Sequence, residues 1–195
     1  MLQMNFRGSS GYGHDFMQQG LASWGQAMQD DVADGTQWLI DQNIADKDKI
    51  CILGASYGGY AALMGGVKTP ELYRCIVSFA GVTDVERLVK QSRRYTNYDI
   101  VKKQIGSDYD QLWDNSPLKY AEQIDKPVLL IHGSKDRVVR VNHSERMYDE
   151  LKDEGKSVRY IELDGGDHYL SNNRHRLTTF KAIESFLGQY NPTNE

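Results

Sequence analysis

The sequence is short of the features that mark several protein classes. Two cysteines among 195 residues are too few for a disulfide framework or a cysteine-rich metal site. No apolar run approaches the roughly 20 residues that cross a bilayer, and the first residues lack the pattern of a secretory signal. The 23 Lys and Arg are interspersed with 27 Asp and Glu, giving a net charge of -4 without a basic face. These absences predict a soluble protein with no membrane or nucleic-acid partner and favour the cytoplasm.

The two cysteines themselves point to a packing role. Cys51 and Cys75 each begin an apolar run that is typical of a buried strand. Free cysteine behaves as a small buried hydrophobe, so we expect two core thiols and no disulfide. No metal-ligand cluster and no cofactor motif is recognisable. The 39% hydrophobic content suffices for one core, and no repeat or linker divides residues 1–195, which predicts one domain.

Short apolar runs alternate along the chain with amphipathic stretches. The runs are too short for helices and mostly lack polar alternation, as expected for strands buried on both faces of a parallel sheet; they cover 50–54, 75–80, 127–132 and 158–163. Helices are expected over 30–42, 142–155 and 173–190, the second with an Asn142 cap. Their apolar stripes are Val32, Trp38, Leu39 and Ile40; Met147, Tyr148 and Leu151; and Leu177, Phe180, Ile183, Phe186 and Leu187. The alternation predicts an α/β domain with a mostly parallel sheet flanked by helices.

One serine lies in the sequence context of a catalytic nucleophile. Residues 54–58 read Gly-Ala-Ser-Tyr-Gly, follow a predicted strand and precede a small-residue helix from Tyr57 to about Val67. This is the pattern of a nucleophile elbow, in which glycines at both ends, here Gly54 and Gly58, let strand and helix approach each other. A Gly-rich packing turn is the alternative. A phosphate cradle is disfavoured because no Gly-Lys-Ser/Thr follows.

A serine nucleophile needs a base and a group that orients the base. In this fold class the acid and then the histidine follow the serine along the chain, each after a later strand. Asp136 follows the run at 127–132, and His168 follows the run at 158–163. We therefore predict Asp136 as the acid and His168 as the base.

Other acidic and histidine residues compete for these roles. Asp84, which follows the strand ending near Ala80, is the rival acid, whereas Asp164 and Asp167 are more simply turn residues. The remaining histidines are expected in a strand, near a helix start, in the last helix and in the N-terminal loop: His132, His143, His175 and His14, respectively. Each is read as a core or surface residue.

An ordered set of motifs resembles the C-terminal catalytic domain of the prolyl oligopeptidase family of serine peptidases. The motifs are NFRGSSGYG at 5–13, WG at 24–25, GASYGGYAAL at 54–63, HGSKDRVV at 132–139 and GGDHYL at 165–170. Their spacing is most similar to the acylaminoacyl-peptidase and dipeptidyl-peptidase branches. The resemblance implies an α/β-hydrolase fold that cleaves short peptides through an acyl-enzyme.

The resemblance also assigns roles to individual residues. Ser56 would be the nucleophile, Asp136 the orienting acid and His168 the general base, while the backbone N–H of Tyr57 would stabilise the oxyanion. An apolar substrate pocket would be lined by Val82, Val85 and Val139.

The sequence departs from the family at its N-terminus. Family members carry, upstream of the segment like NFRGS, a further strand, a loop that gives a second oxyanion donor, and a β-propeller. The chain begins directly on that segment, so we expect a fragment of the catalytic domain that lacks the first strands and the propeller. With one oxyanion donor its activity would be weak or absent. The sheet edge between the nucleophile strand and a strand around 2–7 would be left open, which predicts a homodimer or larger assembly through the N-terminal region.

Three functions therefore remain open. The first is a serine peptidase with residual or restorable activity. The second is a small carboxylesterase or thioesterase, because esters need less leaving-group protonation than amides. The third is a fragment without catalytic activity that associates through its sheet edge.

Overall fold

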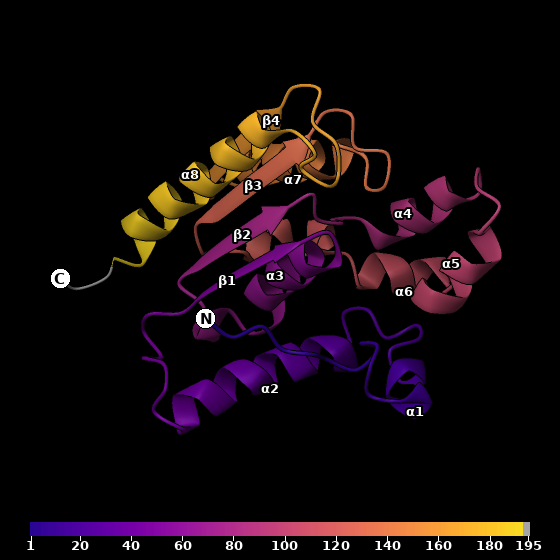
Figure 1. Cartoon of the computed structure of the whole chain (residues 1–195), viewed down its shortest axis with the longest axis horizontal. Helices are drawn as coiled ribbons and strands as arrows, with labels where there is room; N and C mark the ends of the chain where they lie inside the picture. The colour runs from indigo at the N-terminus through magenta and orange to yellow at the C-terminus, as the bar shows by residue number, and fades with distance from the viewer. Residues whose placement is uncertain (193–195) are drawn as a thin grey trace.

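The computed structural model describes residues 1–192 and forms a four-stranded parallel sheet with helices on both faces (Figure 1). The strands are β1 (Cys51–Ala55), β2 (Cys75–Phe79), β3 (Val128–Gly133) and β4 (Val158–Leu163), in the order β1-β2-β3-β4. The α-helices are α1 (His14–Gln18), α2 (Ala27–Asp41), α3 (Tyr57–Lys68), α4 (Val85–Ser92), α5 (Tyr98–Ile105), α6 (Tyr109–Asp114), α7 (Asn142–Asp153) and α8 (Asn173–Tyr190). Short 3₁₀ segments, η1 (Pro70–Leu72) and η2 (Pro117–Gln123), complete the described elements. The four predicted strands are confirmed to within one residue at each end.

Alternate residues of β2 and β3 face opposite layers, which explains why neither strand alternates with polar residues. One face packs Ile76, Val128 and Leu130 against α3 and α7. The other face packs Val77, Leu129 and Ile131 against Ala182 and Phe186 of α8. Figure 1 shows α8 on one side of the sheet and α3 with α7 on the other. Both strands are fully buried, as the continuous apolar runs predict.

The apolar stripes were predicted with mixed success. In α7, Met147 and Leu151 are buried as expected, although Val141 rather than Asn142 occupies the N-cap position. In α8 the buried stripe is Thr179, Ala182 and Phe186, with Ile183 and Leu187 beside it, whereas Leu177 and Phe180 are 57% and 63% exposed. In α2 the buried residues are Met28, Gln29 and Thr36, and Trp38 is 52% exposed. Val32, Leu39 and Ile40 of α2 are half-buried. The prediction was wrong for Trp38 of α2 and for Leu177 and Phe180 of α8, because helix orientation depends on which neighbour the helix meets.

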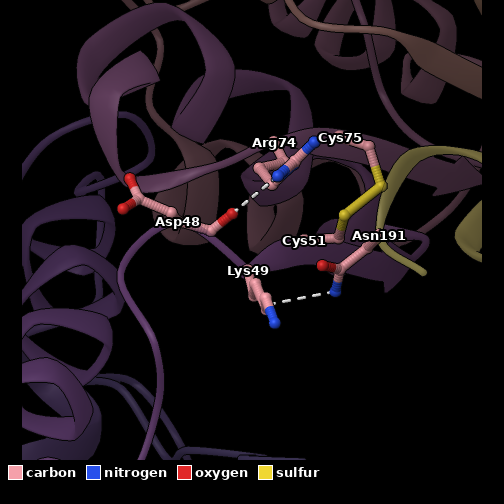
Figure 2. Close-up of a disulfide and its surroundings, with 6 residues drawn as sticks. All are labelled: Asp48, Lys49, Cys51, Arg74, Cys75 and Asn191. Carbon is pink, nitrogen blue, oxygen red and sulfur yellow. Dashed lines mark hydrogen bonds between the residues drawn. A yellow bond between two sulfur atoms is a disulfide. The ribbon is translucent and has the colours of Figure 1, made fainter. Parts of the chain in front are cut away.

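Cys51 and Cys75 form a disulfide, so the prediction of two free core thiols was wrong. The two residues are register partners at the start of the neighbouring strands β1 and β2. Their Cα atoms lie 4.8 Å apart, within the range that a disulfide spans. Figure 2 shows the bond beside two hydrogen bonds that also tie this end of the sheet, from Arg74 to the Asp48 carbonyl and from Asn191 to the Lys49 carbonyl. The cysteine count therefore gives no support to a reducing compartment.

The N-terminal segment does not form the strand expected around residues 2–7. The Arg7 guanidinium instead forms a two-pronged ion pair with Asp31 of α2, with Nε–Oδ2 and Nη2–Oδ1 distances of 2.7 and 2.5 Å. Phe6 packs on the ring of Tyr57 at 5.1 Å between centroids. The segment is thus held on α2 and α3 rather than on the sheet, and among the described residues β1 pairs with β2 alone. Within residues 1–192, no helix is both long and apolar enough to cross a membrane.

Candidate active site

Ser56 occupies a sharp turn between β1 and α3. Its φ of 57° and ψ of -118° lie outside the regions that a non-glycine residue ordinarily adopts. Such strain persists only where the surroundings enforce it. The Ser56 N–H donates to the Phe79 carbonyl at 2.9 Å, and the Ser56 carbonyl accepts from Tyr60 N at 3.1 Å. These bonds join the turn to β2 on one side and to the first turn of α3 on the other.

The glycines around the serine have unequal roles. A methyl group on Gly54 would lie 2.1 Å from the carbonyl oxygen of Gly58, so residue 54 must be glycine for strand and helix to cross there. A methyl group on Gly58 would meet nothing within 4 Å. The expectation that both positions must lack a side chain is therefore right for Gly54 and wrong for Gly58. Gly59 is the second necessary glycine, because its methyl group would reach Ser78 Oγ at 2.7 Å and Gly81 Cα at 2.8 Å.

The predicted acid and base are brought together at the carboxyl ends of β3 and β4. The Nδ1 of His168 lies 2.6 Å from Oδ2 of Asp136. Because a carboxylate only accepts, Nδ1 carries the proton, and the Nε2 lone pair is left to accept one. Asp136 is held in turn by two backbone donors, Val138 N at 2.8 Å and Val139 N at 2.9 Å, both to Oδ1.

The loops that carry these two residues are joined backbone to backbone. Ser134 N donates to the Leu163 carbonyl at 3.0 Å and Lys135 N to the Gly166 carbonyl at 2.8 Å. A methyl group on Gly133 would lie 2.4 Å from the Gly166 oxygen, so the close approach requires glycine at that point. The separation of Asp136 and His168 is thereby fixed by the main chain.

His132 is a second histidine at the acid, and sequence reasoning left it as an ordinary core residue. Its Nε2 lies 2.9 Å from the Val139 carbonyl and 3.3 Å from Asp136 Oδ2, and its Nδ1 lies 2.7 Å from Ser144 Oγ. A carbonyl only accepts, so Nε2 carries the proton and Nδ1 accepts from the serine hydroxyl. A polar residue inside an otherwise apolar strand was the sequence signal for this role.

Electrostatics keep the Asp136 carboxyl ionised. Burial alone would raise the pKa of Asp136, but hydrogen bonds from His132 and His168 outweigh it and hold that pKa well below its ordinary value. His168 therefore donates to a charged acceptor, which orients the imidazole and stabilises it when it is protonated.

The rival residues have other partners. Asp84 caps α4 by accepting from Arg87 N at 2.8 Å, and its second oxygen pairs with Arg146 at 2.6 Å. Asp167 accepts from the Tyr169 and Ser171 amides, as a turn residue does. Neither is hydrogen-bonded to His168 within residues 1–192.

His143 is fully buried, and its Nδ1 accepts weakly from the Thr83 and Asp84 amides at 3.3 and 3.4 Å. Burial lowers the pKa of His143 to about 3. Nearby Asp84 opposes this shift, while the positive charges of Arg87 and Arg146 add to it. His143 is thus a neutral core residue, as expected.

Tyr57 is the first residue of α3, where a backbone N–H has no acceptor within the helix. Its ring lies in an aromatic cluster with Phe6, Trp24 and Tyr60, at centroid distances of 5.1, 4.6 and 5.6 Å. Burial of the Tyr57 ring raises the pKa of its hydroxyl. The NFRGS and WG motifs therefore contribute Phe6 and Trp24 as packing for the residue after the serine, a role that their sequence spacing does not reveal.

Val82, Val85 and Val139 do come together, but in the core. They are 1%, 0% and 2% exposed and share one cluster with Tyr60 and Met64. We therefore assign these three valines to packing around α3 rather than to a substrate surface. Within residues 1–192, no group of three or more His, Cys, Asp or Glu is arranged to hold a metal ion.

Comparison with known proteins identifies the family. The model of the prolyl oligopeptidase family matches residues 1–192. The chain belongs to this family of serine peptidases. Dipeptidyl aminopeptidase BIII of Pseudoxanthomonas mexicana is 31% identical over 196 residues, which cover 97% of the chain and 28% of that protein. The acylamino-acid-releasing enzyme of Mus musculus is 28% identical over 182 residues, covering 88% of the chain and 24% of that protein.

Solved structures of two peptidases confirm the α/β-hydrolase fold. A Pyrococcus horikoshii acylaminoacyl peptidase superposes with a TM-score of 0.86 at 28% identity, covering 98% of the chain and 32% of that structure. A puromycin-hydrolyzing peptidase of Mycobacterium tuberculosis superposes with a TM-score of 0.90 at 26% identity, covering 97% of the chain and 29% of that structure. The chain thus spans about three-tenths of the length of these relatives.

Proposed function

We propose that this chain is a serine hydrolase acting on short peptides, with Ser56 as nucleophile, His168 as general base and Asp136 as the acid that orients it. The observation that carries the proposal is the 2.6 Å hydrogen bond between His168 and Asp136. It leaves His168 Nε2 free to accept a proton, at the same edge of the sheet as the strained Ser56 turn. Two of the relatives are named dipeptidyl aminopeptidase and acylaminoacyl peptidase, which supports peptides as the substrate class.

The reaction follows from these positions. Ser56 Oγ attacks the peptide carbonyl while His168 Nε2 takes the hydroxyl proton, and the same proton then passes to the leaving amine. Water then attacks the acyl-enzyme while His168 Nε2 takes a proton from it, and the same proton returns to Ser56 Oγ as the acid product leaves. The Tyr57 amide would stabilise the oxyanion, and a second donor would be worth roughly a hundredfold to a thousandfold in rate.

The test is labelling with a fluorophosphonate probe, which reacts with activated serines, followed by mass spectrometry of the modified peptide. We expect modification at Ser56 that is lost in Ser56→Ala and strongly reduced in His168→Ala and Asp136→Asn. His175→Ala, which changes a histidine of α8 outside the proposed triad, is the matched control and should label like the parent chain. A folded chain that is not labelled would overturn the proposal and favour the noncatalytic fragment.

A substrate panel then separates peptidase from esterase activity. Dipeptidyl anilides, acetyl-aminoacyl anilides and a nitrophenyl ester should be tested side by side. Cleavage of an anilide supports the peptidase. Cleavage of the ester alone supports the carboxylesterase or thioesterase, since an ester needs less protonation of its leaving group.

A further inference from the structure

A groove of about 540 Å³ lies between the α4–α5 connection and the turn that follows the proposed acid. Its apolar wall includes Leu88, Val101, Ile105 and Val138. Val138 belongs to the turn that holds Asp136, because its amide donates to the Asp136 carboxylate. One wall of the groove is therefore built from the same short segment as the acid, and its volume is that of a small-molecule site.

The charged side chains that line the groove are all positive. Three arginines line it, Arg94, Arg137 and Arg140, and no Asp or Glu of residues 1–192 does. All three are exposed. In contrast to Arg7 and Arg146, which have carboxylate partners, none of the three makes an ion pair or side-chain hydrogen bond with any residue in the described range 1–192.

This combination favours an anionic ligand. A cleft lined by charges of one sign concentrates ions of the opposite sign, and guanidinium groups pair with carboxylates through two parallel hydrogen bonds. The net charge of the chain is -4, so the convergence of three unpaired arginines is a local feature rather than a consequence of an overall basic surface. A peptide carries carboxylates of two kinds, at its C-terminus and on Asp or Glu side chains.

We propose that this groove binds a carboxylate of the peptide substrate, which makes anionic peptides the preferred substrate class. The inference deepens the proposed function and rests on it for the identity of the ligand. The apolar wall would take the aliphatic part of the bound residue, and the three guanidinium groups would take its charge.

Binding is measured by titration calorimetry at low salt with the Ser56→Ala variant, so that no turnover is needed. Three N-acetylated probes are compared: acetyl-glycyl-phenylalanyl-alanine with a free C-terminal carboxylate, its C-terminal amide, and the C-terminal amide of acetyl-glycyl-phenylalanyl-glutamate, so that the second is neutral and the other two each carry one negative charge. We expect at least one anionic probe to bind about tenfold more tightly than the neutral amide, which corresponds to about 1.4 kcal/mol. Preference for the free tripeptide identifies the C-terminal carboxylate, and preference for the glutamate probe identifies a side chain.

Substitutions of the arginines test whether the groove causes the preference for anionic probes. Replacing all three arginines with glutamine should abolish the preference, and Arg137→Gln alone should reduce it if the triple variant does not fold. Arg159→Gln, an exposed arginine on β4 outside the groove, is the matched control and should leave the preference unchanged. Equal affinity for charged and neutral probes, or a preference that survives in Arg137→Gln and the folded triple variant, overturns the inference. Binding without fluorophosphonate labelling of the parent chain would leave the groove standing and remove the catalytic proposal.

Discussion

The close crossing of β1 and α3 at Ser56 can be tested with Gly54 and Gly58, because a methyl group added at Gly54 would clash and one added at Gly58 would not. At Gly54 a methyl carbon would lie 2.1 Å from the Gly58 oxygen and 2.2 Å from its carbonyl carbon. Real contacts of this kind stay above 3.0 Å, so strand and helix must separate by at least 0.9 Å (3.0 less 2.1). Both atoms are main chain, so no side chain can rotate away. We expect Gly54→Ala to cost about 3 kcal/mol, the upper end for overpacking.

Gly58→Ala adds the same methyl group with the opposite expected sign. Apart from its chain neighbours and the backbone of its own helix, no atom of residues 1–192 lies within 4 Å of that position, and residue 58 is helical. Replacing glycine by alanine in a helix stabilises by up to about 1 kcal/mol. The two variants should therefore differ by about 4 kcal/mol, or roughly 8 to 16 °C in Tm for a domain of this size.

Thermal unfolding of both variants, with fluorophosphonate labelling of each, measures the effect. Gly54→Ala should unfold at the lower temperature and label poorly because Ser56 is displaced, whereas Gly58→Ala should match or exceed the parent chain in Tm and retain labelling. Equal Tm values for the two variants would refute the close crossing of β1 and α3 that is described for this turn.

Three further outcomes are expected. Reduction of the Cys51–Cys75 disulfide should lower the free energy of unfolding in urea by about 3.4 kcal/mol, the loop-closure value for a separation of 24 residues, and the double alanine variant should not respond to the reductant. His143 has a pKa of about 3 when folded but binds a proton near pH 6.5 when unfolded. Lowering the pH between these values should therefore reduce the free energy of unfolding by up to about 1.4 kcal/mol per pH unit. Urea titrations at several pH values should show a smaller slope for His143→Gln. We propose that the open β1 edge, where Leu53 is 50% exposed, supports a homodimer. Light scattering at micromolar concentration should give the mass of a dimer for the parent chain and of a monomer for Leu53→Lys. A monomeric parent chain would count against the proposal.

Sequence reasoning was most successful where one residue type is demanded by local geometry or by burial on both sides. The continuous apolar runs at 75–80 and 127–132 identified β2 and β3, because a strand covered on both faces has no polar side. The pattern around Ser56 located the turn between β1 and α3, and the order of loops along the chain selected Asp136 and His168, which the structure brings into contact.

Other features depended on which surfaces meet. The cysteines became a disulfide because β1 and β2 pair in a register that places Cys51 opposite Cys75, and a register between two separate segments cannot be read from either one. The exposed Leu177 and the buried Thr179 of α8 show the same limit for helices, since an amphipathic pattern does not tell which arc faces the sheet. The valines at 82, 85 and 139 were buried by the packing of α3 rather than exposed to a substrate.

Local chemistry thus determined the strands and the residues proposed for catalysis, because backbone strain at Ser56 and burial along a strand act over a few neighbouring residues. Tertiary structure alone decided the partners of those residues: the second histidine on Asp136, the aromatic support of Tyr57 by Phe6, and the arginine groove beside the acid turn. Those contacts join segments that lie far apart in the sequence, and only the closure of the fold brings them within bonding distance.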